Sequence, residues 1–322
     1  MNDDWILDSY LKAVTSFADH IILLDQQSSD RTNEIIKKYE KVELHKNINK
    51  NYNEKERQEL LIKKARFYGD RNVLIALDVD EFFTPEFYLE KNLKWLKSLN
   101  PGISISFNWA NIHWHRKMFW RNKMPPIIYI DDGQDYFDLN TFHRTRVPVS
   151  KKRNVLKIES YDVIHLQFLE ISRVKEKHQW YQLYEFTNMK NRNFVKIYRK
   201  YHHMQTIQKR DLTIIPESWI LFLRSKGIDL KLQDDHNIDK WCRSGEISLM
   251  KSQIPQKQLN KLDLEFNFDI DKAVPQTQIK FDNLVYKYLK TTQRYYRHSN
   301  LYELICFVPI KIIDLLIGKV WK

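Results

Sequence analysis

The sequence contains few of the residues that mark disulfide-rich, zinc-binding or disordered chains. Cys242 and Cys306 are its two cysteines, and they form no CxxC pair. This argues against a disulfide framework or a zinc site, and a reducing cytosol is expected. Only 6 glycines and 9 prolines occur in 322 residues, which argues against disorder and against a small turn-rich β protein. We expect no signal peptide, because Met1 leads directly into Asn2-Asp3-Asp4.

Acidic residues are in deficit. The chain has 53 Lys and Arg against 41 Asp and Glu, which gives a formal net charge of +12. Such an excess favours an anionic partner: nucleic acid, a phospholipid surface or a phosphorylated substrate. The cations are spread along the chain without a clustered basic stripe, so a nucleic-acid-binding protein is the less favoured alternative. Aromatic residues are plentiful, with 17 Phe, 17 Tyr and 9 Trp, and predict a well-populated core.

Short apolar runs alternate with helix-like segments in the first 80 residues. Strands are predicted over residues 20–25, 42–45 and 72–78, and helices over 5–18, 32–39 and 54–68. This alternation indicates βαβ units and a parallel sheet. Ligands of such sheets bind at the carboxyl ends of the strands, where Asp25 and Asp78 both lie.

The pattern continues less regularly after Phe82. A helix is predicted over 85–99, strands over 102–109, 141–148, 155–158 and 162–168, and a helix over 172–188, with an irregular aromatic stretch through residue 138. From about residue 210, helix-like segments dominate. We therefore predict an α/β domain over 1–209, with a mixed sheet flanked by helices, and a mainly helical region over 210–322.

The acidic cluster Asp78-Val79-Asp80-Glu81 closes the apolar run Val-Leu-Ile-Ala-Leu. Asp78 and Asp80 are two residues apart at a strand end, so their carboxylates project to the same side. Two such oxygen donors can hold Mg²⁺ or Mn²⁺ together with substrate phosphates. The alternative is a helix cap, in which Asp80 or Thr84 caps the helix that begins at Pro85.

The segment Asp25-Gln-Gln-Ser28-Ser-Asp30-Arg-Thr32 resembles the D-x-x-S-x-D-x-T segment that follows the second strand of family-2 glycosyltransferases. The resemblance covers residues 2–110 well and 110–200 loosely, and the remainder has a general likeness to bacterial surface-polysaccharide enzymes. It implies a GT-A fold, inverting transfer, a divalent metal and a UDP- or GDP-sugar donor. It also implies that Asp25, Ser28, Asp30 and Asp78 hold the nucleotide, with Arg57 facing the nucleotide or diphosphate. An ordinary N-cap is the alternative role of Asp30, and the two roles are compatible.

The chain departs from this family at its beginning. Family members start with a β-strand followed by an Asn-Glu or Asn-Asp pair, and this chain starts at that pair, Asn2-Asp3. A missing central strand would leave two strands with unpaired backbone groups, which is costly. The expectation is therefore either an N-terminally truncated sequence or a non-catalytic member of the same fold.

Two further site residues are predicted from their positions. Inverting transfer needs a carboxylate that accepts the proton of the acceptor hydroxyl, and Asp132 is our candidate, with a solvated turn as the alternative and Glu159 and Asp162 as rivals. His165 lies near the end of an apolar run. The resemblance implies that it is a third metal ligand beside Asp78 and Asp80, and a hydrogen-bonded core histidine is the alternative.

The segment Leu301–Trp321 is apolar but is interrupted by Glu303, Pro309, Lys311, Asp314 and Lys319. No uninterrupted stretch reaches the roughly 20 apolar residues of a membrane span. With the preceding cations it predicts either peripheral membrane contact through residues 294–322 or a terminal helix docked on the protein itself. The predicted function is sugar transfer from a nucleotide-diphosphate donor to a glycan or lipid-linked acceptor in cell-surface polysaccharide synthesis, in the cytoplasm or at the inner face of the plasma membrane.

Overall fold

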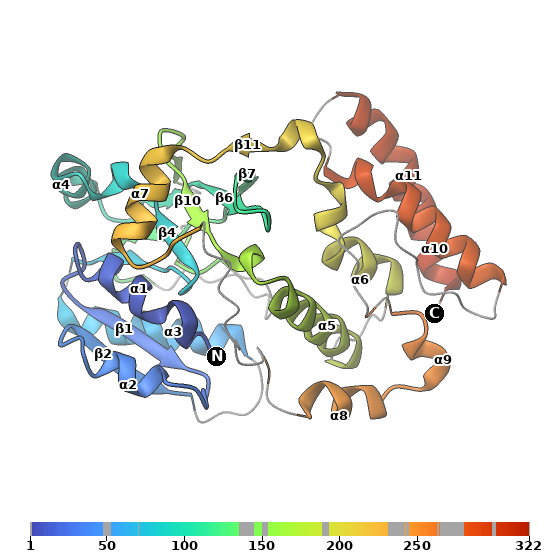
Figure 1. Cartoon of the computed structure of the whole chain (residues 1–322), viewed down its shortest axis with the longest axis horizontal. Coiled ribbons are helices and arrows are strands. Elements are labelled where there is room, and N and C mark those ends of the chain that lie inside the picture. Colours follow the sequence, from blue (N-terminus) through green and yellow to red (C-terminus); the bar gives the residue numbers. More distant parts are fainter. Residues whose placement is uncertain are drawn as a thin grey trace. The chain divides into compact units, whose positions relative to one another are not determined.

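The computed structural model describes residues 2–47, 53–69, 71–134, 145–149, 154–188, 193–230, 242, 245–262, 264, 280–297 and 301–321. The chain divides into two compact units, each made of two stretches of sequence (Figure 1). Unit 1 comprises Met1–Leu169 and Thr213–Asp239, and unit 2 comprises Glu170–Leu212 and Lys240–Lys322. The sequence placed one boundary near residue 210, whereas the segment from Thr213 to Asp239 groups with unit 1.

Unit 1 has mixed α/β architecture, which confirms the predicted fold class. The elements of unit 1, with 3-10 helices written η, are α1 (Asp4–Val14), β1 (Ile21–Asp25), α2 (Thr32–Ile36), β2 (Val42–Lys46), α3 (Glu54–Ala65), η1 (Arg66–Tyr68), β3 (Val73–Ile75), β4 (Glu81–Phe83), η2 (Pro85–Tyr88), α4 (Glu90–Ser98), β5 (Ser104–Ser106), β6 (Asn108–Ile112), β7 (Met118–Lys123), β8 (Ile128–Ile130), β9 (Val155–Lys157), β10 (Val163–His165), η3 (Gln167–Leu169), β11 (Thr213–Ile214) and α7 (Glu217–Ser225).

The strands described in unit 1 form three sheets. β1 and β2 pair in parallel, as the βαβ pattern predicted. The second sheet has the order β11-β7-β6-β10-β4, and the third has the order β3-β8-β5-β9. Both larger sheets mix parallel and antiparallel neighbours; for example, β10 is parallel to β6 and antiparallel to β4.

β1 and β3 are both edge strands in the part of the chain that the structure describes. β1 pairs with β2 alone there, and β3 pairs with β8 alone. Each strand therefore presents one backbone edge without a strand neighbour among the described residues. Helix α3 packs against β1, and the side chain of Asn53 caps this helix by accepting a hydrogen bond from Glu56 N at 3.3 Å.

The core of unit 1 is divided between the two faces of β4. Phe82 packs with Leu7 and Leu11 of α1 and with Ile21 of β1. Successive side chains of a strand point to opposite faces, so Phe83 enters a second cluster and stacks on Phe87 at 3.6 Å between ring centroids. Fully burying each such side chain stabilises the fold by about 1.5–3 kcal/mol. These contacts fix β4 and the turn that precedes it, which carries Asp78 and Asp80 and is called the acidic turn below.

The described residues of unit 2 form mainly helices: α5 (Ile171–Asn188), α6 (Phe194–Tyr201), η4 (His203–Thr206), η5 (Lys209–Asp211), α8 (Glu246–Ser252), α9 (Gln256–Leu259), α10 (Lys280–Thr292), η6 (Gln293–Arg297) and α11 (Leu301–Val320). The residues described include no helix, in either unit, with the length and apolar character required to cross a membrane.

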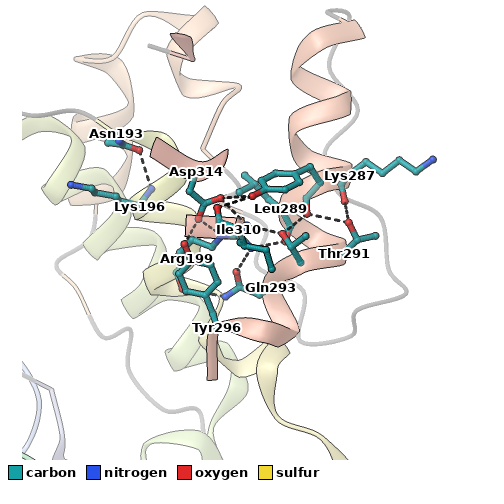
Figure 2. Close-up of polar contacts among 12 residues, drawn as sticks. Asn193, Lys196, Arg199, Lys287, Leu289, Thr291, Gln293, Tyr296, Ile310 and Asp314 are labelled. Carbon is teal, nitrogen blue, oxygen red and sulfur yellow. Dashed lines mark hydrogen bonds and ion pairs between the residues drawn. The ribbon is translucent and has the colours of Figure 1, made fainter. Parts of the chain in front are cut away.

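A buried arginine joins four helical segments of unit 2 (Figure 2). Arg199 of α6 forms a two-point ion pair with Asp314 of α11, through Nε at 3.1 Å and Nη2 at 3.0 Å. Its remaining donors reach Leu289 O, Gln293 Oε1 and Thr292 Oγ1 at 2.7–3.0 Å. All five guanidinium N–H groups are thus used within this arrangement.

The structure differs from the sequence prediction between residues 110 and 148. The stretch expected to be irregular contains β7 and β8, and β7 forms an antiparallel hairpin with β6. The predicted helix over 85–99 consists of η2 and α4, which are separated at Leu89. Residues 141–144 of a predicted strand lie outside the described residues, and residues 145–149 form no strand.

Candidate active site

The turn between β3 and β4 carries Asp78, Asp80 and Glu81. Glu81 N donates a hydrogen bond to Asp78 O, and Asp78 N donates one to Glu81 Oε2, both at 3.0 Å. The side chains are 56%, 17% and 0% exposed, respectively. Asp78 is therefore open to solvent, and Glu81 is part of the interior. Thr84 occupies the N-cap position of η2 without a capping hydrogen bond from its side chain.

Arg146 lies against this turn and was not found by sequence reasoning. Its guanidinium contacts Asp78 Oδ2 at 2.8 Å and Glu81 Oε1 at 3.0 Å, with a further ion pair to Glu81 Oε2. It also lies 5.6 Å from the ring of Trp109. Burial alone disfavours the charged form, but the carboxylates of Asp78 and Glu81 outweigh it and raise the pKa of Arg146. A permanent cation thus sits inside the acidic turn.

The register of three strands brings the other polar groups to this turn. His165 of β10 pairs with Glu81 of β4 on one side and with Asn111 of β6 on the other. Paired residues share a face of the sheet, and so does Trp109, two residues before Asn111. Trp109 Nε1 donates to Glu81 Oε1 at 2.8 Å, and its ring stacks on His165 at 5.5 Å between centroids.

His165 is oriented by one neighbour and faces another. Its Nδ1 lies 2.9 Å from Asn111 Oδ1, and its Nε2 lies 3.6 Å from Asp80 Oδ2. Because the carbonyl oxygen of Asn111 only accepts hydrogen bonds, the tautomer of His165 with a proton on Nδ1 fits this contact, and Nε2 lies on the side of Asp80. This tautomer is the one that ligates a metal through Nε2.

Two of the three predicted metal ligands, Asp80 and His165, face each other near the turn. The described residues contain no group of three or more His, Cys, Asp or Glu side chains that could hold a metal by themselves. Asp80 and His165 face each other, while Asp78 is paired with Arg146. Mg²⁺ is commonly held by one or two carboxylates plus substrate phosphates and water. Asp80, assisted by His165, is therefore the best-placed metal ligand of the predicted three.

The loop that follows β1 is held together by Asp25 and by the N-terminal residues. Both carboxylate oxygens of buried Asp25 accept from Ser28 N, at 3.0 and 3.1 Å. Ser28 Oγ in turn accepts from Asn2 N at 3.0 Å, and Ser29 N donates to Asn2 Oδ1 at 3.0 Å. The predicted nucleotide-binding residues Asp25 and Ser28 thus lie together in one ordered loop.

Asp30 belongs to the same loop and caps a helix that comes earlier in the sequence. Its Oδ2 accepts from Asp4 N, at the start of α1, and its Oδ1 accepts from Thr32 N, both at 3.0 Å. The Arg31 side chain contacts Asp4 at 3.0 Å. Asp30 therefore satisfies exposed N–H groups at the starts of both α1 and α2. The N-cap position of α2 is Arg31, so Asp30 is not its ordinary N-cap, and the role of Asp30 in nucleotide binding stays a prediction.

Helix α1 links this loop to the acidic turn. It begins at Asp4, beside Asp30, and Tyr10 lies six residues further along, which is about 9 Å of helix. The ring of Tyr10 lies near the acidic turn. Burial raises the pKa of Tyr10, and the nearby charges of Asp78 and Glu81 raise it further. The loop after β1 and the turn after β3 are two separate groups of side chains, joined by one helix.

Arg57 and Asp132 lie on elements other than the acidic turn. Arg57 lies in the first turn of α3, which packs against β1. Asp132 accepts from Tyr129 Oη at 2.5 Å and from Gln134 N at 2.9 Å. Because β8 is antiparallel to β3 and Asp131 N donates to Asn72 O, Asp132 lies at the amino end of β3. Asp78 lies beyond the other end of β3, in the turn before β4, and the roles of Arg57 and Asp132 stay predictions.

The two rivals for the proton acceptor are engaged in ion pairs. Glu159 pairs with Lys157 on the surface. Buried Asp162 accepts from Arg121 Nε at 2.9 Å.

Part of the chain matches a known protein family. A search of curated proteins returns no significant relative of the sequence. The matched stretch includes the loop after β1, the acidic turn, Trp109 and Arg146, and it ends before His165. Residues 6–157 match the model of the family described as Glycosyl transferase family 2, and this match supports a glycosyltransferase.

Proposed function

We propose that the protein transfers a sugar from a UDP- or GDP-sugar to an acceptor hydroxyl, with inversion at the sugar carbon. The observation that carries this proposal is the acidic turn within the segment similar to glycosyl transferase family 2. Proteins of that family generally use nucleotide-sugar donors, often with a metal. An exposed carboxylate, the facing side chains of Asp80 and His165, and an arginine lie together at this turn and support the proposal.

Arg146 supports a diphosphate at this turn. Arginine presents paired N–H groups that match phosphate oxygens. Its contact with Glu81 is buried, whereas its contact with Asp78 is on the exposed side of the turn. A donor diphosphate could therefore take the place of Asp78 on the guanidinium while Glu81 continues to hold the arginine in position. Asp78 would be released to bind the ribose or the metal.

Asp80 and His165 are the residues that would hold Mg²⁺ or Mn²⁺. A bound divalent ion would neutralise the charge that develops on the departing diphosphate. Asn111 contacts His165 Nδ1 and so leaves Nε2 on the side of Asp80, and the hydrogen bond from Leu166 N to Asp80 O at 2.9 Å holds the backbone of Asp80.

The acceptor and the cellular setting belong to the proposal as well. We propose a glycan or lipid-linked acceptor in bacterial cell-surface polysaccharide synthesis, at the inner face of the plasma membrane. The excess of basic residues supports an acceptor or surface of negative charge.

The proposal is tested by nucleoside diphosphate release from a panel of UDP- and GDP-sugars, with Mn²⁺, Mg²⁺ or EDTA. We expect turnover with at least one donor, loss of turnover in EDTA, and a fall of about 10²–10³-fold in Asp80→Asn, because a group that stabilises developing charge is removed. The matched control is Glu90→Gln, an acid on the surface of α4 paired only with exposed Lys94 among the contacts described. The proposal would be refuted if the wild type bound no donor. It would also be refuted if Asp80→Asn bound the donor as the wild type does, without a need for metal.

The variant Asp132→Asn distinguishes the two roles predicted for Asp132, a general base and a residue of a solvated turn. A general base contributes about 10²–10⁴-fold to the rate, so a loss of that size in kcat, with the fold intact, would support the sequence prediction. We expect instead near-wild-type kcat, because Asp132 is hydrogen-bonded within its own turn at the amino end of β3.

A further inference from the structure

Helix α11 has an unusually apolar exposed face. Its side chains Ile305, Val308, Ile312 and Leu316 are 63%, 56%, 56% and 58% exposed. Leu304, Ile313, Leu315 and Val320 are also exposed. We call this set the α11 outer face. Soluble proteins rarely expose so many large aliphatic side chains on one element, so a partner is expected to cover them.

The opposite face of α11 is fixed to unit 2. Ile310, Asp314, Gly318 and Trp321 are buried, and their spacing of four, four and three residues places them on one side of the helix. Asp314 accepts from Arg199 and from Tyr288 Oη at 2.9 Å, and it also contacts Tyr296 (Figure 2).

A close contact on this buried face fixes the rotation of α11 further. Gly318 packs directly against Asn193: a Cβ atom on Gly318 would lie 2.5 Å from Asn193 Nδ2, which is too close without a shift of one side chain. Asn193 is already used as the cap of α6, because its Oδ1 accepts from Lys196 N at 3.1 Å. Buried charge and close packing therefore hold α11 in one rotation, and the α11 outer face cannot turn inward.

The exposed charges of α10, η6 and α11 favour a membrane over a second protein copy as the partner of this face. Basic side chains are exposed on all three segments: Lys311 and Lys319 on α11, Lys280 and Lys287 on α10, and Arg294 on η6. The acidic side chains described on these helices, Asp282 and Asp314, are buried and hydrogen-bonded to Trp321 and Arg199, respectively. Two copies would bring like charges together, whereas an anionic bilayer would attract them.

We propose that the α11 outer face docks this protein onto an anionic lipid bilayer, with α11 lying along the surface. The aliphatic side chains would enter the region between headgroups and acyl chains, and the exposed lysines would extend their charged ends to the headgroups. The ion pair of Asp314 with Arg199 keeps one side of the helix on unit 2, so the helix lies on the membrane and does not cross it.

The test is binding of the full chain to vesicles of phosphatidylcholine with 30% phosphatidylglycerol, measured by flotation. We expect the wild type to bind, and Ile312→Asp/Leu316→Asp to bind at least about tenfold more weakly, because two charges would enter the apolar region. Leu249→Asp is the matched control: Leu249 is 60% exposed on α8 of the same unit, and binding should change less than about twofold. Unchanged binding by the double variant would overturn the proposal.

Folding and self-association are examined in the same samples. The substituted side chains are exposed, so the double variant should unfold in urea at the wild-type midpoint. Sedimentation without vesicles should show the wild type and the variant in the same oligomeric state. A wild-type dimer that the double variant breaks, together with no vesicle binding, would assign the α11 outer face to self-association and refute the membrane proposal. Vesicle binding requires neither donor nor metal, so this inference and the proposed transferase function fail separately.

Discussion

At the residue scale, Glu81 is the centre of the candidate site although it is not exposed. Its carboxylate accepts from Asp78 N and Trp109 Nε1 and pairs with Arg146. A buried carboxylate is stable only when it is hydrogen-bonded and paired. Glu81 therefore acts as a positioning residue, which orients Arg146 toward the exposed side of the turn.

Arg146→Ala should destabilise unit 1 by about 3 kcal/mol, because the variant leaves Glu81 charged and buried without its partner. Urea unfolding measures this change. Lys94→Ala removes one partner of an exposed pair, whose side chains are 74% and 78% exposed, and should cost less than about 0.5 kcal/mol. Equal losses in the two variants would show that the buried pair is not special.

His113 predicts a pH dependence of stability. Burial, followed by the nearby charge of His115, lowers the pKa of His113 to about 4, below its ordinary 6.5. The folded state therefore favours neutral His113, and this stabilisation is present above pH 6.5 and is lost as the pH falls toward 4. His113→Gln should reduce the loss of unfolding free energy between pH 7 and pH 5 by about 1 kcal/mol, because solvent screens part of the effect. A variant with the wild-type difference would contradict this assignment.

At the scale of elements, the starts of α1 and α2 depend on one loop. Asp30 accepts from the backbone of Asp4 and of Thr32. The D-x-x-S-x-D-x-T segment was recognisable in sequence because its spacing is local. Its use as the cap of an earlier helix was not, because Asp4 and Asp30 are brought together only by tertiary packing.

Asp30→Ala and Asn53→Ala form a matched pair of cap variants. Each removes a side-chain cap from a helix, and each should cost about 1–2 kcal/mol in urea unfolding. Only Asp30→Ala should also weaken binding of the nucleotide, measured by calorimetry with UDP and GDP, because it loosens the loop after β1. Equal affinity in both variants would leave Asp30 with a capping role alone.

The strands show which elements a sequence can predict. β1 and β2 were predicted with nearly correct bounds, because β1 is an apolar run and the apolar residues Val42 and Leu44 of β2 alternate with polar ones. β3 was predicted longer than it is, as the backbone leaves the ladder after Ile75. β7 was missed because Met118–Lys123 shows no clear alternation of apolar and polar residues, and β8 was missed because it has only three residues and pairs with the distant strand β3.

The candidate site was predictable to the same extent. Asp78 and Asp80 were found because two carboxylates close an apolar run. His165 was found through a family likeness, and the structure places it beside Asp80. Arg146, Trp109 and Asn111 carry no sequence signal, since each reaches the turn only through strand register or a distant loop.

At the scale of the whole molecule, the net charge of +12 has a measurable consequence. If anionic headgroups attract the exposed lysines and arginines near α11, raising NaCl from about 0.1 M to about 0.5 M should weaken vesicle binding by roughly tenfold, because the screening length shortens from about 10 Å to about 4 Å. Lys311→Glu/Lys319→Glu should show a smaller salt effect. Binding that is insensitive to salt in both proteins would argue that apolar insertion acts alone.

The five-donor use of Arg199 also limits how this protein can be altered. The partners of this guanidinium come from α10, η6 and α11. Deleting the last helix would remove Asp314 and leave a buried cation facing no carboxylate, which is strongly destabilising. Removing α11 therefore removes both its apolar outer face and the ion pair on its inner side. Shortening the chain to improve its solubility would unfold unit 2, whereas polar substitutions on the outside would leave it folded.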